Sequence, residues 1–179
     1  MAALALIRHG EYEQLADTPS ALQPYPLTDR GAKEVRRQAQ RFGGWLSDAG
    51  YRLQADIHCS TSLRAWQTAE IYRQELTDFF SAPPIVVSFS ALCERSVGAV
   101  ANLSVREIER IVELDPRFDP LPEGWKSNRD FKLPFDGSES LKEAGERVAT
   151  HLNALPIYEQ DNLIQLVVGH GASIRHASF

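Results

Sequence analysis

The decapeptide ALALIRHGEY, residues 3–12, changes character abruptly, and its two halves give the first indication of the fold. The apolar run from Ala2 to Ile7 has the length of one short strand. Because it does not alternate with polar residues, it is typical of a strand buried on both faces in a parallel sheet. The run ends at Arg8 and His9, and Gly10 follows at once. The sequence therefore predicts a buried strand that presents two polar side chains at its carboxyl end.

The rest of the chain alternates between strand and helix patterns. Further short strands are expected over 55–59, 85–87 and 163–168, and amphipathic helices over 28–50, 62–76, 105–112 and 140–155. Strands that alternate with helices of these lengths form βα units, in which parallel strands are covered by helices. We therefore expect an α/β fold, a three-layer α/β/α sandwich with a mostly parallel sheet, formed by residues 1–179 as a single domain.

Composition excludes several functional classes. Hydrophobic residues make up 43% and charged residues 24% of the 179, which is ordinary for globular proteins, and the net charge is −5 without a long basic run. This argues against a nucleic-acid or membrane partner, and no apolar stretch approaches the ~18 residues of a membrane span. The two cysteines, Cys59 and Cys93, are expected to be small buried apolar residues, in a chain that resides in the cytoplasm.

Five chargeable residues fall where the predicted strands end or the next helices begin: Arg8, His9, Arg64, Glu94 and His170. In open α/β sheets, ligands bind outside the carboxyl ends of the strands, where the variable loops and helix N-termini gather. We therefore expect these side chains, although distant in sequence, to meet at one edge of the sheet.

Two arginines and two histidines around one point suit a phosphate dianion, because guanidinium groups bind phosphate oxygens through paired hydrogen bonds. A neutral imidazole is also a nucleophile near pH 7, so one histidine is able to carry a phosphoryl group. Glu94 would then protonate the departing alkoxide and later accept a proton from water. This scheme needs no metal and no other cofactor.

Four motifs in collinear order resemble the histidine phosphatase superfamily, also called phosphoglycerate mutase-like. They are IRHGE at 7–11, STSLRAWQTA at 60–69, LCERSVG at 92–98, and a late pair, SESL at 138–141 with VGHG at 168–171. The resemblance covers essentially the whole chain. It implies the phosphoglycerate mutase-like form of the α/β/α sandwich and phosphoryl transfer through a phosphohistidine.

By this resemblance, His9 is the nucleophile and Glu94 is the proton donor. Arg8, Arg64 and His170 form the phosphate pocket. Three departures from the family pattern are visible: no Trp-Glu-Gly follows the acid, no Asn follows in the residues after His9, and the chain ends soon after the Gly-His-Gly motif. Because relatives usually continue through a helix and often a strand, we expect a shortened or minimal form of the domain.

The region 116–137 is rich in proline, charge and aromatic residues without periodicity, which predicts an excursion from the core and the region that sets specificity. Five of its residues either recognise the rest of the substrate or form a solvated basic loop: Trp125, Lys126, Asn128, Arg129 and Lys132. Outside this region, His58 is expected to be a packed or edge residue, and His151 and His176 are expected at the surface.

The sequence leaves several functions open. A phosphatase acting on a small phosphorylated substrate is favoured over a phosphoglycerate-type phosphomutase, because mutases generally carry longer insertions between the acid and the late helix. A catalytically idle phosphate-binding or regulatory module is a third possibility, and a phosphatase of phosphorylated proteins is a fourth. The sequence makes no prediction of the oligomeric state.

Overall fold

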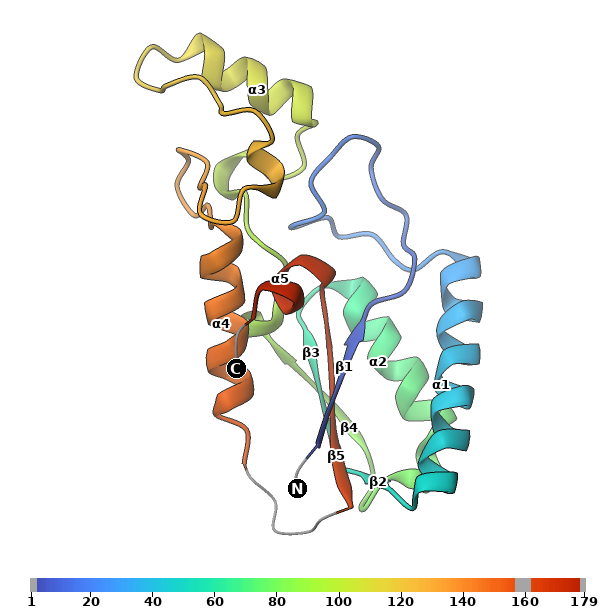
Figure 1. The fold of residues 1–179 in the computed structure, drawn as a ribbon. Coiled ribbons are helices and arrows are strands. Elements are labelled where there is room, and N and C mark those ends of the chain that lie inside the picture. Colours follow the sequence, from blue (N-terminus) through green and yellow to red (C-terminus); the bar gives the residue numbers. More distant parts are fainter. Residues whose placement is uncertain (1–2, 157–161, 178–179) are drawn as a thin grey trace.

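The computed structural model describes residues 3–156 and 162–177, and its centre is a parallel sheet (Figure 1). The strands are β1 (Ala3–Arg8), β2 (Arg52–Leu53), β3 (Asp56–Ser60), β4 (Ile85–Phe89) and β5 (Leu163–Gly169). Four of them lie in the order β1-β5-β3-β4, and the short β2 also pairs with β5. Every pairing between these strands is parallel, as predicted.

Helices cover both faces of this sheet, which confirms the predicted α/β/α sandwich (Figure 1). The helices are α1 (Asp29–Ala49), α2 (Leu63–Glu75), α3 (Val105–Leu114), α4 (Leu141–Asn153) and α5 (Gly171–His176). On β5, Leu166 packs into the cluster of residues from α1 and α2. Its neighbour Val167 packs with residues of α4 on the opposite face. This alternation along one fully buried strand places β5 between the two helix layers.

Local signals in the sequence set the ends of α1. The Thr28 side chain accepts a hydrogen bond from the backbone N–H of Gly31 and caps the helix. At the other end Gly50 takes the left-handed conformation, with φ at 70°, which ends the helix at low steric cost. Three apolar residues on one face, Val35, Ala39 and Leu46, are buried. The backbone N–H of Thr28 donates to the Glu11 carbonyl at 3.0 Å, so the start of α1 packs against the segment that follows the Arg8-His9-Gly10 turn.

The burial predicted for the first strand is wrong. β1 stands at the end of the strand order and has β5 as its partner, and none of its residues is fully buried. Leu4, for instance, is 37% exposed. A run of Ala and Leu is compatible with either an edge or a central strand, so its composition could not distinguish them. Ala2, which the prediction included, lies outside the described residues.

The region 116–137 is not merely an excursion, because it contributes to a second small core. Trp125 and Leu133 are buried in a cluster with residues of α3 and of the segment before it, such as Val100 and Ile108. The aromatic residues occur at irregular spacing, so this packing leaves no periodic pattern in the sequence.

Among the described residues, no helix is long and apolar enough to span a membrane.

His58 is packed, as predicted, but the surface position predicted for His151 is wrong. His58 Nδ1 lies 3.0 Å from His151 Nε2, and His58 Nε2 lies 2.8 Å from an Asp56 carboxylate oxygen. The two imidazoles also pack against Phe89. His151 is half-buried because α4 lies over β3 and β4, a contact between distant segments that the helix pattern alone does not show. His176 is also half-buried, not fully at the surface.

Two glycines of α1 provide a matched test of how this helix supports the turn after β1. A Cβ on Gly31 would overlap the Glu11 carbonyl group, next to Gly10, whereas a Cβ on Gly44 would meet no atom within 4 Å. We predict that Gly31→Ala lowers the free energy of unfolding by about 1–3 kcal/mol through overpacking. Gly44→Ala is expected to raise it by about 0.5–1 kcal/mol, because alanine favours an exposed helix position. Urea denaturation of both variants measures this, and equal effects would contradict the prediction.

Candidate active site

The predicted site residues gather at the carboxyl edge of the sheet. Arg8 and His9 end β1, Arg64 is in the first turn of α2, and His170 joins β5 to α5. The ring centroids of His9 and His170 lie 4.9 Å apart. Glu94 follows β4 and is bound to the start of α5. The edge rule for parallel sheets therefore placed the residues correctly, and their roles remain to be argued from the geometry.

Arg64 is the centre of this cluster and is fully buried. Its Nε donates to His9 Nε2, and its Nη2 donates to His170 Nδ1, each over 3.3 Å. The other hydrogen bonds go to backbone carbonyls: Nη1 to Gln23 at 2.8 Å, and Nη2 to Ser20 at 2.7 Å and Ala21 at 3.5 Å. Carbonyl dipoles and imidazole lone pairs thus replace the hydration of the buried Arg64 guanidinium.

The hydrogen bonds of His9 fix its tautomer. Its Nδ1 lies 2.8 Å from the carbonyl oxygen of Gly10, which only accepts, so Nδ1 carries the proton. Arg64 donates to Nε2, so Nε2 carries the lone pair. The nitrogen that would attack phosphorus is therefore unprotonated and points at the guanidinium, where a phosphoryl oxygen would be attracted.

His170 is oriented in the same way. Because its Nδ1 accepts from Arg64, its Nε2 carries the proton and donates to Ser60 Oγ at 2.8 Å. The Ser62 hydroxyl lies 3.3 Å from the same nitrogen. Ser60, at the end of β3, and Ser62, just after it, therefore hold this ring, and both belong to the motif at 60–69.

Burial keeps both imidazoles neutral. The pKa of His9 falls from its ordinary value of 6.5 to about 4, mainly through burial, with Arg64 and Arg8 adding to the effect. The pKa of His170 is also lowered well below the ordinary value, by burial first and then by Arg64. At neutral pH both imidazole rings are therefore uncharged, and the positive charge of the site comes from Arg8 and Arg64.

Arg8 lies at the rim of the cluster. Its side chain is exposed and runs past Gly171, whose added Cβ would lie 3.3 Å from Arg8 Cδ and Nε. Its charge nevertheless lowers the pKa of both His9 and His170, so the guanidinium is within electrostatic reach of the two rings. Arg8 therefore adds an exposed positive charge near the two rings, whereas the charge of Arg64 is buried.

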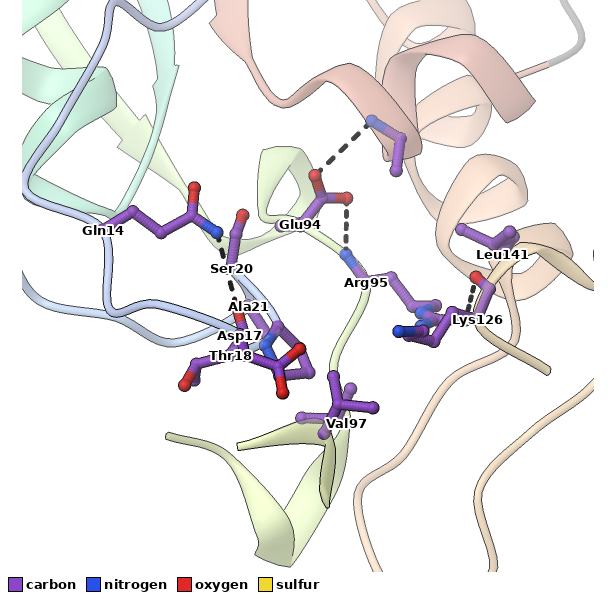
Figure 2. Close-up of a pocket in the computed structure, with 13 residues that line it drawn as sticks. Gln14, Asp17, Thr18, Ser20, Ala21, Glu94, Arg95, Val97, Lys126 and Leu141 are labelled. Atoms are coloured by element: carbon purple, nitrogen blue, oxygen red, sulfur yellow. Dashed lines mark hydrogen bonds between the residues drawn. The ribbon is translucent and has the colours of Figure 1, made fainter. Parts of the chain in front are cut away.

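Glu94 lies in a cleft of about 360 Å³ that is also lined by Gln14, Ser20 and Ala172 (Figure 2). One carboxylate oxygen, Oε1, accepts from the backbone N–H of Arg95 at 2.9 Å and of Ser173 at 3.1 Å. The second, Oε2, accepts only a longer bond from the N–H of Ala172, at 3.4 Å. The first turn of α5 therefore fixes the carboxylate and leaves Oε2 with free bonding capacity.

Besides Glu94, the cleft is lined by two basic residues and by one acidic residue, Asp17. Arg95 and Lys126 line it, and Arg95 Nη1 donates to the Lys126 carbonyl at 3.4 Å (Figure 2). Of the other basic-loop residues considered from sequence, Trp125 is buried in the second core, and Asn128, Arg129 and Lys132 do not line this cleft. Lys132 instead pairs with Glu143 of α4. Only part of the basic loop therefore faces the site.

Several supporting residues were not identified from the sequence. Gln23 is buried, accepts from the backbone N–H of Leu15 and donates to the carbonyls of Thr18 and Pro19, which shapes the loop that holds Arg64. Thr68 Oγ accepts from the backbone N–H of Gly10 at 3.1 Å and donates to the Arg64 carbonyl at 2.8 Å. The buried Gln23 had no recognisable signal, whereas Thr68 belongs to the motif that contains Arg64.

Arg147 supports the segment that carries Glu94, as Gln23 supports the loop that holds Arg64. It forms a two-pronged ion pair with Glu139, at 2.8 and 2.7 Å, and donates to the carbonyls of Ala91 and Cys93. The segment that carries Glu94 is therefore fixed by α4 as well as by α5. A half-buried ion pair between residues eight positions apart has no signature in a helical pattern.

The two cysteines differ in environment. Cys59 is buried, as expected. Cys93 is only half-buried and lies 3.4 Å from Ser60 Oγ and 3.1 Å from Thr61 Oγ1. The expectation of two buried apolar residues is therefore wrong for Cys93, because it lies on the loop between β4 and Glu94 and borders a small cleft beside His170.

Comparison with known structures agrees with this fold. The alpha-ribazole phosphatase from Shigella flexneri has a TM-score of 0.66 and 24% identity, over 96% of this chain and 75% of that one. The phosphoglycerate mutase from Bacillus anthracis str. Sterne has a TM-score of 0.66 and 20% identity, over 97% of this chain and 76% of that one. At these identities the likeness concerns the fold alone.

Comparison of sequences identifies the family. The 2,3-bisphosphoglycerate-dependent phosphoglycerate mutase of Brucella ovis is 28% identical over 180 residues, which cover 96% of this chain and 77% of the relative. The family model of the histidine phosphatase superfamily (branch 1) matches residues 4–178. The match spans nearly the whole chain and includes every residue of the cluster around Arg64. The chain therefore belongs to the histidine phosphatase superfamily, branch 1.

Proposed function

We propose that this chain is a metal-independent phosphatase that hydrolyses a small phosphomonoester through a phosphohistidine on His9. The observation that carries the proposal is the lone pair of neutral His9 Nε2, directed at the guanidinium of Arg64. Arg8, Arg64 and His170 bind the phosphoryl oxygens. The charge that stabilises the dianion is supplied by the two arginines of the chain itself.

The first step transfers the phosphoryl group to the protein. His9 Nε2 attacks phosphorus, the bond to the leaving oxygen breaks, and that oxygen takes a proton from Glu94. We assign the proton to Oε2, because Oε1 already accepts two shorter hydrogen bonds from backbone N–H groups. The alcohol then leaves through the cleft beside Glu94, whose wall contains Arg95 and Lys126.

The second step returns the protein to its starting state. A water molecule attacks phosphorus from the cleft, Glu94 takes its proton, and the bond from phosphorus to Nε2 breaks. Inorganic phosphate leaves and the lone pair returns to Nε2. One carboxyl group thus acts first as an acid and then as a base, and atoms and protons balance over the two steps.

A phosphoglycerate-type mutase is the second candidate, and the Brucella relatives favour it. The two activities share the phosphohistidine and differ in what accepts the phosphoryl group. We favour water, because a hydrolase needs no contacts to a second sugar-acid beyond those of the cleft. The cleft of about 360 Å³, with Arg95 and Lys126 in its lining, suits a small alcohol that carries negative charge, and no nucleic-acid or membrane partner is part of the proposal. We also propose a cytoplasmic location, because Cys59 and Cys93 are free thiols.

Removal of the nucleophile tests the enzyme against an idle binding module. We predict that the wild-type protein hydrolyses p-nitrophenyl phosphate in the presence of EDTA, and that His9→Ala lowers kcat by at least about 10³-fold, because it removes the attacking atom. A radiolabelled phosphoryl group that is stable to base and labile to acid should appear on the wild type only. Wild type and variant that are equally inert, yet bind orthovanadate, would indicate an idle module.

The fate of that phosphoryl group separates hydrolysis from mutase activity. With 3-phosphoglycerate and a 2,3-bisphosphoglycerate primer, we predict that inorganic phosphate forms faster than 2-phosphoglycerate, because water is the acceptor. Release of phosphate and isomerisation of phosphoglycerate can be followed in one sample by ³¹P NMR. Isomerisation faster than phosphate release would contradict the hydrolase and establish the mutase.

The protonation of His9 is a third expectation, since its pKa is about 4 in the folded protein. Titration followed by ¹⁵N NMR should show Nε2 unprotonated from pH 8 down to about pH 5. Between pH 6.5 and 4, His9 binds a proton in the unfolded chain but not in the folded protein. The contribution of His9 to the free energy of unfolding is therefore fully present above pH 6.5 and is lost as the pH falls toward 4. The free energy of unfolding should therefore decrease over that range, and less so in His9→Gln. A midpoint for His9 near 6.5 would refute the assignment.

A further inference from the structure

The phenol of Tyr12 is a polar group at the site to which no role has yet been given. Tyr12 lies three residues after His9 and is only 7% exposed. Its hydroxyl is buried and has no hydrogen-bond partner within residues 3–156 and 162–177. A buried hydroxyl without a partner destabilises a folded protein, so its presence calls for an explanation.

The ring of Tyr12 lies against both central groups of the site. Arg64 Cζ is 4.4 Å from the ring centroid, a cation–π contact, and the His9 ring meets it edge-on with centroids 5.4 Å apart. Burial lowers the pKa of Arg64, and Tyr12 is the first of the groups that oppose this effect. The phenol oxygen is therefore within electrostatic reach of the guanidinium.

The position of this ring does not depend on its hydroxyl. Tyr12 forms an isolated antiparallel bridge with Leu27, and its carbonyl accepts from the backbone N–H of Gln14 at 2.7 Å. The next residue, Glu13, donates its backbone N–H to Pro26 at 3.0 Å. Backbone pairing and the contact with Arg64 hold the ring, so the hydroxyl is free to bind a ligand.

We propose that Tyr12 is a catalytic residue whose phenol donates a hydrogen bond to a non-bridging oxygen of the phosphoryl group bound between His9 and Arg64. The inference rests on the proposed function and adds a donor to it. Negative charge spreads over those oxygens in the transition state, and a donor that is already in place stabilises it without reorganisation. The phosphoryl oxygen supplies the partner that the hydroxyl lacks.

The variant Tyr12→Phe tests this assignment, because it keeps the ring against Arg64 and removes only the hydroxyl. We expect kcat/KM for p-nitrophenyl phosphate and the affinity for orthovanadate each to fall about 10- to 100-fold, the usual effect of losing a hydrogen bond to a charged group. The melting temperature should be unchanged or higher, since the variant loses a buried group that has no partner. A purely structural hydroxyl would give the opposite combination.

Tyr72→Phe is the matched control. Tyr72 is also buried, lies on α2, and lines the same depression of about 550 Å³ beside His9 as Tyr12 does. Its hydroxyl is not among the buried atoms that lack a partner in the described parts of the chain. This variant should keep the wild-type kcat/KM and orthovanadate affinity.

The two measurements separate this inference from the proposed function. If the wild type hydrolyses the ester and Tyr12→Phe is equal to it in both measurements, the role of Tyr12 is refuted and the phosphatase stands. A second outcome is that the wild type binds orthovanadate but hydrolyses no ester, and that Tyr12→Phe binds orthovanadate more weakly. In that case the phosphoryl contact stands and the phosphatase fails. A melting temperature several degrees lower in Tyr12→Phe, or no orthovanadate binding by the wild type, overturns the inference.

Discussion

The structure of this site depends on one buried charge, the guanidinium of Arg64. Moving an ion out of water costs several kcal/mol unless other groups replace its hydration. Here the replacement comes from three carbonyls of the segment 20–23, two imidazole nitrogens and the face of Tyr12. Both imidazoles offer lone pairs to the guanidinium, and burial, reinforced by the charge of Arg64, lowers their pKa values and keeps them neutral. In the proposed mechanism, the same arrangement that stabilises the charge also prepares His9 as the nucleophile.

The carbonyls that bind Arg64 also connect the sheet to the second core. Ala21 accepts from Arg64 through its backbone, while its side chain is buried with Val97, Val105 and Trp125. The backbone N–H of Val105, at the start of α3, donates to the Asp17 carbonyl of the same loop at 2.7 Å. The loop therefore has one set of contacts on the phosphate side and another on the α3 side. The cleft that contains Glu94 is lined by residues from both sides, such as Ser20 and Val105, so its shape depends on both sets of contacts.

The sequence was a good guide wherever function depends on the ends of strands and helices. Parallel strands bring their carboxyl ends to one edge, so Arg8, His9 and His170 could be placed together before any coordinates were known, and cap residues such as Thr28 located the helices. It failed where contacts are made by loops without periodicity. Nothing local distinguishes Gln23, whose amide shapes the Arg64 loop, from an exposed glutamine, and nothing marks Arg147 as the residue that holds the Glu94 segment. The Gln23 amide bonds stay within its own loop, which has no periodic pattern, whereas the Arg147 bonds reach carbonyls 54 and 56 residues away, which only the folded chain brings near.

The hydrogen bond between Arg64 and His9 must break before the proposed attack. His9 Nε2 cannot attack phosphorus while its lone pair accepts the N–H of Arg64 Nε. In the proposed mechanism, a phosphoryl group that enters the site takes over this N–H, because a hydrogen bond to an anionic oxygen is stronger than one to a neutral imidazole. The exchange leaves the bonds from Arg64 to Gln23 and Ser20 intact, so the guanidinium keeps its position while its ring-facing N–H groups change partner. Binding of the dianion and release of the nucleophile's lone pair are then one event. On this proposal, the imidazole of His9 becomes reactive only when phosphorus is beside it.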